Sequence, residues 1–222
     1  MSGETFAVDR RVTLKWLAGA MTAAGVPLNG AYAAAPAAWP EGTPPPVSGP
    51  GYGTDPALLE GPVPWPKTLS AAQLDTAAAL ADTILPPEGK WPAPSTTGVH
   101  HFIDEWVSAP YPEQVADRAT LFNGFAWVER EAQARHKRGY SKLGEAERAA
   151  ILRDAAAADP KGMAFLQRMK FLTCGAYYTS EPGIEEIGYV GNVPIEGDYP
   201  GPTPEALAHL DAVLAGLKLK RK

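Results

Sequence analysis

Prolines and glycines are the feature that most limits what this chain can fold into, because they are numerous and unevenly placed. The sequence holds 23 prolines and 22 glycines, and both residue types interrupt helices and strands. Between residues 36 and 66, prolines stand at positions 36, 40, 44, 45, 46, 50, 56, 62, 64 and 66. A second cluster of prolines and glycines occupies residues 179–202. The sequence therefore predicts an extended arm over residues 34–68 and a non-helical segment over 179–202.

Six intervals outside these clusters have the apolar spacing of amphipathic helices. The first begins at Ser70, which can cap the amide of Gln73 while the Gln73 side chain reaches back to Ser70. The expected helices cover residues 70–85, 99–107, 115–134, 144–158, 165–178 and 203–217. No segment has the period of a strand. The expected fold is therefore all-α: an irregular bundle of about six helices with long Pro/Gly-rich extended arms, in one helical domain over residues 69–222.

The first 33 residues have the parts of a twin-arginine (Tat) export signal in the right order. The pair Arg10 and Arg11 precedes a short apolar run, which is followed by Ala31-Tyr32-Ala33, the small-x-small pattern that a signal peptidase accepts. The run is shorter than the roughly 20 residues that a membrane-spanning helix needs. We therefore expect a signal peptide over residues 1–33, export to the periplasm, and no transmembrane segment. The alternative is a disordered amphipathic tail.

The charge balance argues against nucleic acid as a partner. The chain carries 20 basic and 25 acidic residues, a formal net charge of −5. Its basic residues gather at 135–138 and 218–222, and such clusters are more often solvated helix ends than binding sites. Cys174 is the only cysteine, so no internal disulfide is expected, and its apolar neighbours in the sequence favour a buried small side chain.

Residues that could bind a metal or carry out catalysis do not form a recognisable motif. The densest group of possible ligands comprises His100, His101, Asp104 and Glu105. On a helix their two i, i+4 pairs point to different sides, which favours surface pairing over a shared metal. The acidic residues of the segment 179–202 are most simply groups that keep it soluble. We therefore expect no catalytic, cofactor-binding or metal-binding residues in this chain.

Aromatic residues are frequent in the segments that lack a helical period. A solvated linker has little use for such side chains, whereas extended segments that carry them are suited to contact with another protein. An equally supported alternative is that these segments fold back and cover the bundle itself. The side chains expected to contact a partner are Trp39, Tyr52, Trp65, Tyr177, Tyr178, Tyr189 and Tyr199.

Residues 69–202 resemble the gluconate 2-dehydrogenase subunit 3 family, the small subunits of periplasmic FAD-dependent sugar and polyol dehydrogenases. The likeness begins at Leu69-Ser70 and continues through Ile84-Leu85-Pro86. Its most specific part runs from Tyr-Tyr-Thr-Ser-Glu-Pro at 177–182, through Ile-Gly-Tyr at 187–189, to Tyr-Pro-Gly-Pro at 199–202. The proline-rich residues 36–66 lie outside the resemblance.

The resemblance implies a non-catalytic subunit with no cofactor of its own. The implied partner is a large flavoprotein of the glucose-methanol-choline (GMC) class that holds FAD, often with a cytochrome c subunit that holds haem c and would associate the complex with the membrane. In such complexes the small subunit carries the export signal, and the flavoprotein crosses with it after binding its flavin. The alternatives are a stand-alone periplasmic helical enzyme or binding protein, and a periplasmic scaffold without a redox partner.

Overall fold

The computed structural model describes residues 38–49, 51–52, 62–191, 197 and 201–219. It divides into two compact units: unit 1 is Met1–Gly188 and unit 2 is Tyr189–Lys222. The described residues form seven α-helices and no strand, which confirms the expected all-α fold.

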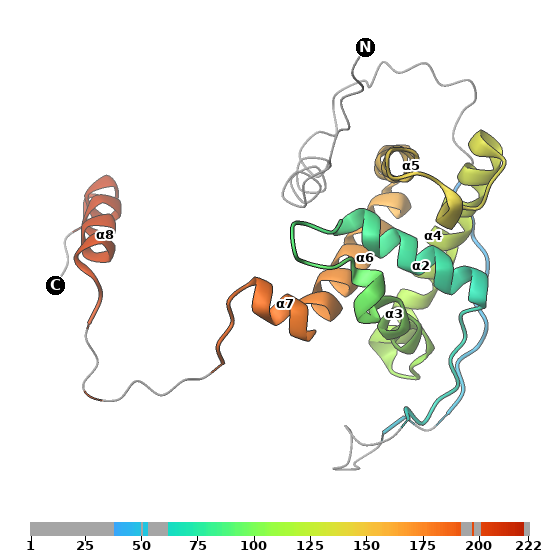
Figure 1. Cartoon of the computed structure of the whole chain (residues 1–222), viewed down its shortest axis with the longest axis horizontal. Helices are drawn as coiled ribbons and strands as arrows, with labels where there is room; N and C mark the ends of the chain where they lie inside the picture. Colours follow the sequence, from blue (N-terminus) through green and yellow to red (C-terminus); the bar gives the residue numbers. More distant parts are fainter. Residues whose placement is uncertain (1–37, 50, 53–61, 192–196, 198–200, 220–222) are drawn as a thin grey trace. The chain divides into compact units, whose positions relative to one another are not determined.

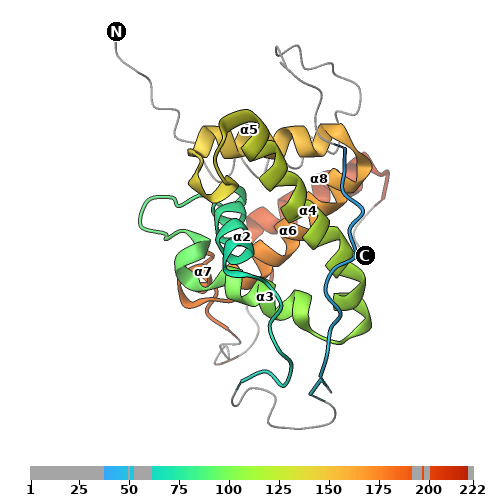
Figure 2. The ribbon, with the colours of Figure 1, turned by 90° about the vertical axis from the view of Figure 1, so that its right-hand side faces the viewer.

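Unit 1 contains all of the described α-helices except α8 (Figure 1). They are α2 (Ala71–Ile84), α3 (Val99–Ser108), α4 (Pro112–His136), α5 (Glu145–Ala158), α6 (Pro160–Tyr178) and α7 (Glu181–Glu186). Two short 3₁₀ helices join them, η1 (Pro94–Thr97) and η2 (Tyr140–Lys142). Helices α2, α3, α4 and α6 pack against one another, and α5 packs across α4 and α6 (Figures 1 and 2).

Local capping explains where the helices begin. The capping box predicted for α2 is present: Ser70 Oγ accepts from the Gln73 amide at 3.3 Å, and the Ser70 amide donates to Gln73 Oε1 at 2.9 Å. Helices α4 and α6 begin earlier than the apolar spacing predicts, because Pro112 and Pro160 each occupy a first turn. A proline there loses no hydrogen bond, since the first amides of a helix have no partner within it.

The segment 179–202, expected to be free of helix, contains the short helix α7. Ser180 caps it, with Oγ accepting from the Gly183 amide at 3.4 Å, and Pro182 lies in its first turn. A Cβ at Gly183 would lie 2.0 Å from the carbonyl oxygen of Tyr177, so only glycine allows this close approach to α6. The expectation is wrong at residues 181–186 because proline and glycine are compatible with a first helical turn.

The core of unit 1 is rich in aromatic side chains. Phe125 and Trp127 of α4 are buried, as is Phe165 of α6, and the rings of Phe125 and Phe165 meet edge to face at 6.0 Å. Burying a side chain of this size stabilises the fold by roughly 1.5–3 kcal/mol. Close contact between α4 and α6 depends on Gly124, because a Cβ there would lie 2.0 Å from Phe165 Cδ2.

We expect Gly124→Ala to lower the free energy of unfolding by about 2–3 kcal/mol, because the added methyl group forces α4 away from α6. Gly175→Ala on α6 is the matched control. It should raise stability by about 0.5–1 kcal/mol, because a Cβ at Gly175 meets nothing within 4 Å and alanine favours a helix interior. Urea unfolding of both variants measures the difference. Equal stabilities would contradict the packing described for Gly124.

Unit 2 contains α8 (Pro204–Gly216), which is capped by Thr203. The Thr203 hydroxyl oxygen accepts from the amide of Ala206 at 3.2 Å, as expected for a cap followed by a first-turn proline. None of the residues of α8 is buried. Across the part of the chain that the structure describes, no helix combines the length and the hydropathy that crossing a bilayer requires.

Candidate interaction surface

The described residues of the proline-rich arm lie against the helices of unit 1, and we call them the strap: residues 38–49, 51–52 and 62–68. Figure 2 shows the first part of the strap running along α4. There the ring of Trp39 stacks on Trp127 at 5.5 Å and lies 6.1 Å from Phe165. The amide of Gly42 donates to Asn123 Oδ1 at 2.9 Å. The strap therefore covers part of the core of its own chain.

The second part of the strap covers the junction between α3 and α4. Trp65 is buried, with its ring edge-on to Tyr52 at 5.1 Å and to Tyr111 at 5.7 Å. Its indole N–H donates to the carbonyl oxygen of Glu105 at 3.3 Å, and the Tyr52 amide donates to the Tyr111 hydroxyl at 2.8 Å. Trp39, Tyr52 and Trp65, expected to contact a partner, thus each contact aromatic residues of this chain.

Arg118 of α4 fastens both parts of the strap. The residue is only 2 % exposed, and burial lowers the pKa of its guanidinium group. Its Nη2 donates to the carbonyl oxygen of Pro45, and its Nη1 donates to the carbonyl oxygen of Val107 and, at 3.3 Å, to Thr68 Oγ1. One cation therefore joins residues that lie far apart in the sequence.

The histidine pair of α3 does not form a metal centre with the acidic residues of the same helix. Asp104 instead binds the end of the strap: its Oδ1 accepts from the amide of Thr68 at 3.2 Å and from that of the next residue, Leu69, at 3.0 Å. The rings of His100 and His101 lie 4.0 Å apart. Burial and the neighbouring His101 lower the pKa of His100, which favours its neutral form. Within the described ranges, no three His, Cys, Asp or Glu side chains are placed to hold a metal ion.

The remaining residues expected at a partner interface have different environments. Tyr177 is fully buried, and its hydroxyl donates to Glu186 Oε2 at 3.0 Å. Tyr178 is half-buried, with its ring edge-on to that of Tyr177 at 5.2 Å. Tyr189, at the start of unit 2, is 60 % exposed. Three named residues lie outside the described part of the chain: Tyr199, Arg10 and Arg11.

A different group of side chains forms an exposed apolar surface on unit 1. Phe171 of α6 is 60 % exposed, and the guanidinium carbon of Arg168 lies 5.2 Å from the centre of its ring. Arg168 Nε lies 2.9 Å from Asp117 Oδ1, while the other oxygen of Asp117 accepts from Trp106 Nε1 at 2.8 Å. Continuous contacts therefore run from α6 through α4 to α3.

The same series of contacts ends at Phe102 of α3, whose exposed ring lies 6.1 Å from that of Trp106. We call this region the α3–α4–α6 surface, comprising Phe102, Trp106, Asp117, Arg168 and Phe171. Large exposed aromatic rings supported by a paired arginine are characteristic of protein–protein contacts. The buried carboxylate of Asp117 binds the side chains of both Trp106 and Arg168. These two side chains in turn contact the rings of Phe102 and Phe171.

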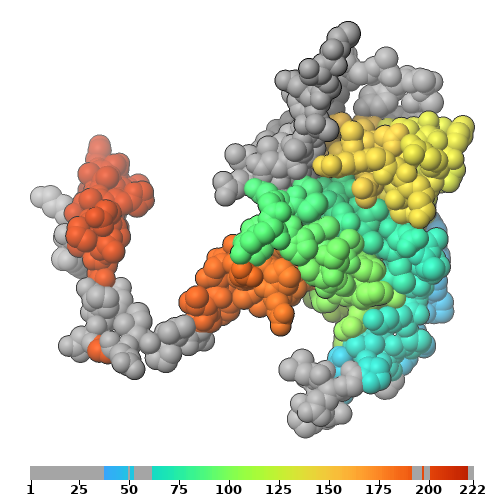
Figure 3. All heavy atoms as spheres, in the orientation of Figure 1, coloured from blue at the N-terminus to red at the C-terminus, as the bar shows by residue number. Residues whose placement is uncertain are grey.

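Helix α6 remains accessible beyond Phe171. Cys174 is half-buried, Gly175 is exposed, and a Cβ at Gly175 would meet nothing within 4 Å. Burial raises the pKa of the Cys174 thiol, which keeps it protonated at neutral pH. Another chain can therefore approach the backbone of α6 between Phe171 and Tyr178. Figure 3 shows this end of α6 and α7, in orange, at the surface of unit 1.

Phe171 was not among the residues singled out from the sequence, although the sequence contains a signal for it. The helical period places Phe165 and Leu172 on the inward side of α6, and both are buried. Phe171 lies one position before Leu172, so the same period directs it outward. A large aromatic residue on the outer side of an amphipathic helix is the sequence signal for an exposed ring, and it gains weight here because Phe171 adjoins Arg168.

A helical body with an exposed apolar surface defines a protein suited to binding another protein. The model of the gluconate 2-dehydrogenase subunit 3 family matches residues 71–201, more than half of the chain, and the chain belongs to that family. Neither a curated protein nor a solved structure matches it. All of the strap and all of α8 lie outside the matched residues.

Proposed function

We propose that this chain is the non-catalytic small subunit of a periplasmic, FAD-dependent GMC-type dehydrogenase that oxidises a sugar, polyol or glycoside. The observation that carries the proposal is membership of a family described as a dehydrogenase subunit, which implies a complex with other subunits. In this proposal the FAD belongs to the large flavoprotein subunit, and haem c belongs to a cytochrome subunit. The small subunit binds the flavoprotein and stabilises it.

The α3–α4–α6 surface is the face that we assign to the flavoprotein. The strap already covers part of α4 and the junction of α3 and α4, whereas Phe102 and Phe171 stay exposed in the isolated chain. Burying two such rings is favourable, at roughly 25 cal/mol per Å² of apolar surface removed from water. Arg168 adds a planar cation beside Phe171, a combination common among residues that dominate binding energy.

Phe171→Glu should weaken binding of the flavoprotein subunit by about 30-fold, because aromatic residues central to an interface contribute about 2 kcal/mol or more. Ala146→Glu, which places the same charge at an exposed position of α5, is the control and should leave the affinity unchanged. Both variants should keep their thermal unfolding temperature. The measurement is a titration of each purified chain with the flavoprotein that its neighbouring genes encode. Wild-type affinity for Phe171→Glu would contradict the assignment of the α3–α4–α6 surface to the flavoprotein.

The same proposal assigns the export of the complex to Arg10 and Arg11. A flavin has to be bound inside a folded protein before export, and the twin-arginine route carries folded proteins, so the flavoprotein would cross as a hitchhiker on this subunit. We expect Arg10→Lys together with Arg11→Lys to retain both chains in the cytoplasm. Cell fractionation with detection of both chains provides the measurement. Periplasmic flavoprotein in the double variant would contradict hitchhiker export.

A further inference from the structure

The junction between η1 and α3 is held by a side chain of α2. Both η1 and α3 pack on α2, and the carboxylate of Asp82 on α2 binds Ser95 of η1 twice. Its Oδ1 accepts from the Ser95 amide at 2.8 Å, and its Oδ2 accepts from the Ser95 hydroxyl at 2.7 Å. Gly98, with a φ of 83°, ends η1 and leads directly into α3. The contact between Asp82 and Ser95 therefore helps to place the first turn of α3.

His100 lies in that first turn, where its surroundings disfavour a positive charge. Its Nδ1 atom is buried and has no hydrogen-bond partner among the residues that the structure describes. The ring centres of His100 and His101 lie 4.0 Å apart, so two imidazolium groups would repel each other. A cation in the first turn of a helix is also opposed by the partial positive charge of the helix N-terminus. The closed geometry thus accommodates a neutral His100.

The charged groups that act on His100 come from α2 and α3. Burial, and then His101, lower the pKa of His100 below its ordinary value, while Asp82 and Asp75 of α2 offset this only in part. The 3₁₀ helix η1 carries only proline, serine and threonine side chains. Asp104, one turn further along α3, accepts from backbone amides outside that helix. Asp82 and Asp75 are therefore the carboxylates that face a protonated His100.

We propose that His100 and Asp82 form an acid-sensitive latch between α2 and the η1–α3 junction. In the closed state His100 is neutral and Asp82 binds Ser95. A protonated imidazole donates from both ring nitrogens, so its Nδ1–H needs an acceptor. Asp82 then leaves Ser95 to pair with the imidazolium, and the first turn of α3 loosens.

The latch opens as the pH falls. Because the closed state lowers the pKa of His100, the open state binds a proton more readily. The closed state therefore has its full stability above the ordinary histidine pKa of 6.5 and loses stability as the pH decreases through that value. Phe102 lies in the same turn, and its amide donates to the Gly98 carbonyl oxygen at 3.2 Å. Acid thus weakens the α3–α4–α6 surface at Phe102, a consequence that rests on the proposed function.

Amide hydrogen exchange of the full chain tests the latch without any partner. Protection is compared at about pH 7.5 and about pH 5, after correction for the intrinsic exchange rate at each pH. The amides of Ser95, His101 and Phe102 should lose protection by about threefold or more at the lower pH. Amides of α6 around Phe165 should not. Unchanged protection at the junction, or an equal loss throughout unit 1, would overturn the proposal.

Three variants locate the response. His100→Gln removes the titrating group and should have the same protection of the junction at both pH values. His101→Gln is the control and should keep the response, because burial is the larger cause of the lowered pKa of His100. Asp82→Asn can still accept from the Ser95 amide but lacks the charge that attracts an imidazolium, so it should lose less protection in acid. An undiminished response in His100→Gln or in Asp82→Asn would contradict the latch.

Titration with the flavoprotein measures the consequence for the α3–α4–α6 surface. Between the same two pH values, the affinity of the wild type should fall by about threefold more than that of His100→Gln. An equal fall in both chains would overturn the regulation of this surface. The exchange experiment needs no partner, so its failure leaves the subunit function standing. Failure of the Phe171→Glu titration would likewise leave the latch standing.

Discussion

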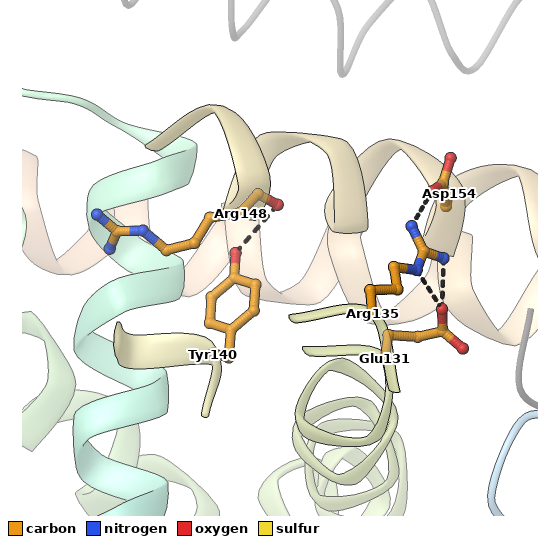
Figure 4. A network of polar contacts seen from close by, with 5 residues as sticks. All are labelled: Glu131, Arg135, Tyr140, Arg148 and Asp154. Atoms are coloured by element: carbon orange, nitrogen blue, oxygen red, sulfur yellow. Dashed lines mark hydrogen bonds and ion pairs between the residues drawn. The ribbon is translucent and has the colours of Figure 1, made fainter. Parts of the chain in front are cut away.

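Replacing Arg135 by methionine will lower the free energy of unfolding by about 3 kcal/mol. Arg135 of α4 lies between two carboxylates whose side chains are only 4 % and 8 % exposed, Glu131 of α4 and Asp154 of α5 (Figure 4). Its Nε donates to Glu131 Oε2 at 2.7 Å, and its Nη1 donates to Asp154. Methionine keeps the length of the side chain and removes the cation, which leaves two nearly buried negative charges without the guanidinium that balances them.

Arg138→Met is the control for this experiment. Arg138 also pairs with a carboxylate, Glu147 of α5, at 2.9 Å, but its own side chain is 51 % exposed. Exposed ion pairs contribute about 0–1 kcal/mol, so this variant should lose less than about 1 kcal/mol. Urea unfolding measures both variants. An equal loss of unfolding free energy in the two variants would contradict the claim that burial of Glu131 and Asp154 makes the Arg135 contacts the more stabilising ones.

Replacing Arg118 by methionine will detach the strap and lower the free energy of unfolding by about 3 kcal/mol. Hydrogen bonds to charged groups contribute about 1.5–3 kcal/mol each, and Arg118 donates to both parts of the strap and to the carbonyl oxygen of Val107. Without the guanidinium, the buried carbonyl oxygen of Val107 and the carbonyl oxygen of Pro45 lose this donor. The amide of Thr68, now held by Asp104 and Ser108, should then open more often.

Trypsin cleavage after Lys67 measures this opening. Lys67 is exposed, but the amide of the following residue, Thr68, is hydrogen-bonded to Asp104 and Ser108. Cleavage after Lys67 should be fast in Arg118→Met and slow in the wild type. Arg130→Met is the control: Arg130 is exposed and donates to the carbonyl oxygen of Ala38 at the start of the strap, so this variant should lose less than about 1 kcal/mol. Wild-type resistance to trypsin in Arg118→Met would show that other contacts hold the strap.

The helical part of the fold could be predicted from the sequence because it depends on local signals. The capping box of Ser70 and Gln73 and the cap at Thr203 both appear as expected. Errors arose at prolines, because a proline can end one helix or occupy the first turn of the next. Pro160 shows this: Asp159 is the last residue before α6 and also its cap, accepting from the Lys161 amide at 2.7 Å.

The placement of the aromatic residues could not be predicted to the same degree. Whether Trp39 and Trp65 pack on a partner or on their own chain depends on long-range contacts, such as Trp39 on Trp127 and the strap with Arg118. Neither spacing nor composition encodes these pairings. Phe171 illustrates the opposite case, because helix periodicity predicts which side chains lie inside α6 and gives no role to those that point outward.

The most direct test of the central claim is to purify the tagged full-length chain after expressing it together with its neighbouring genes. We predict a single complex that contains a second, larger chain, shows the absorption spectrum of bound FAD and reduces an artificial electron acceptor with a sugar or polyol as donor. The isolated chain should have no such activity. A monodisperse chain that elutes without a flavoprotein, or that turns over a substrate alone, would contradict the account.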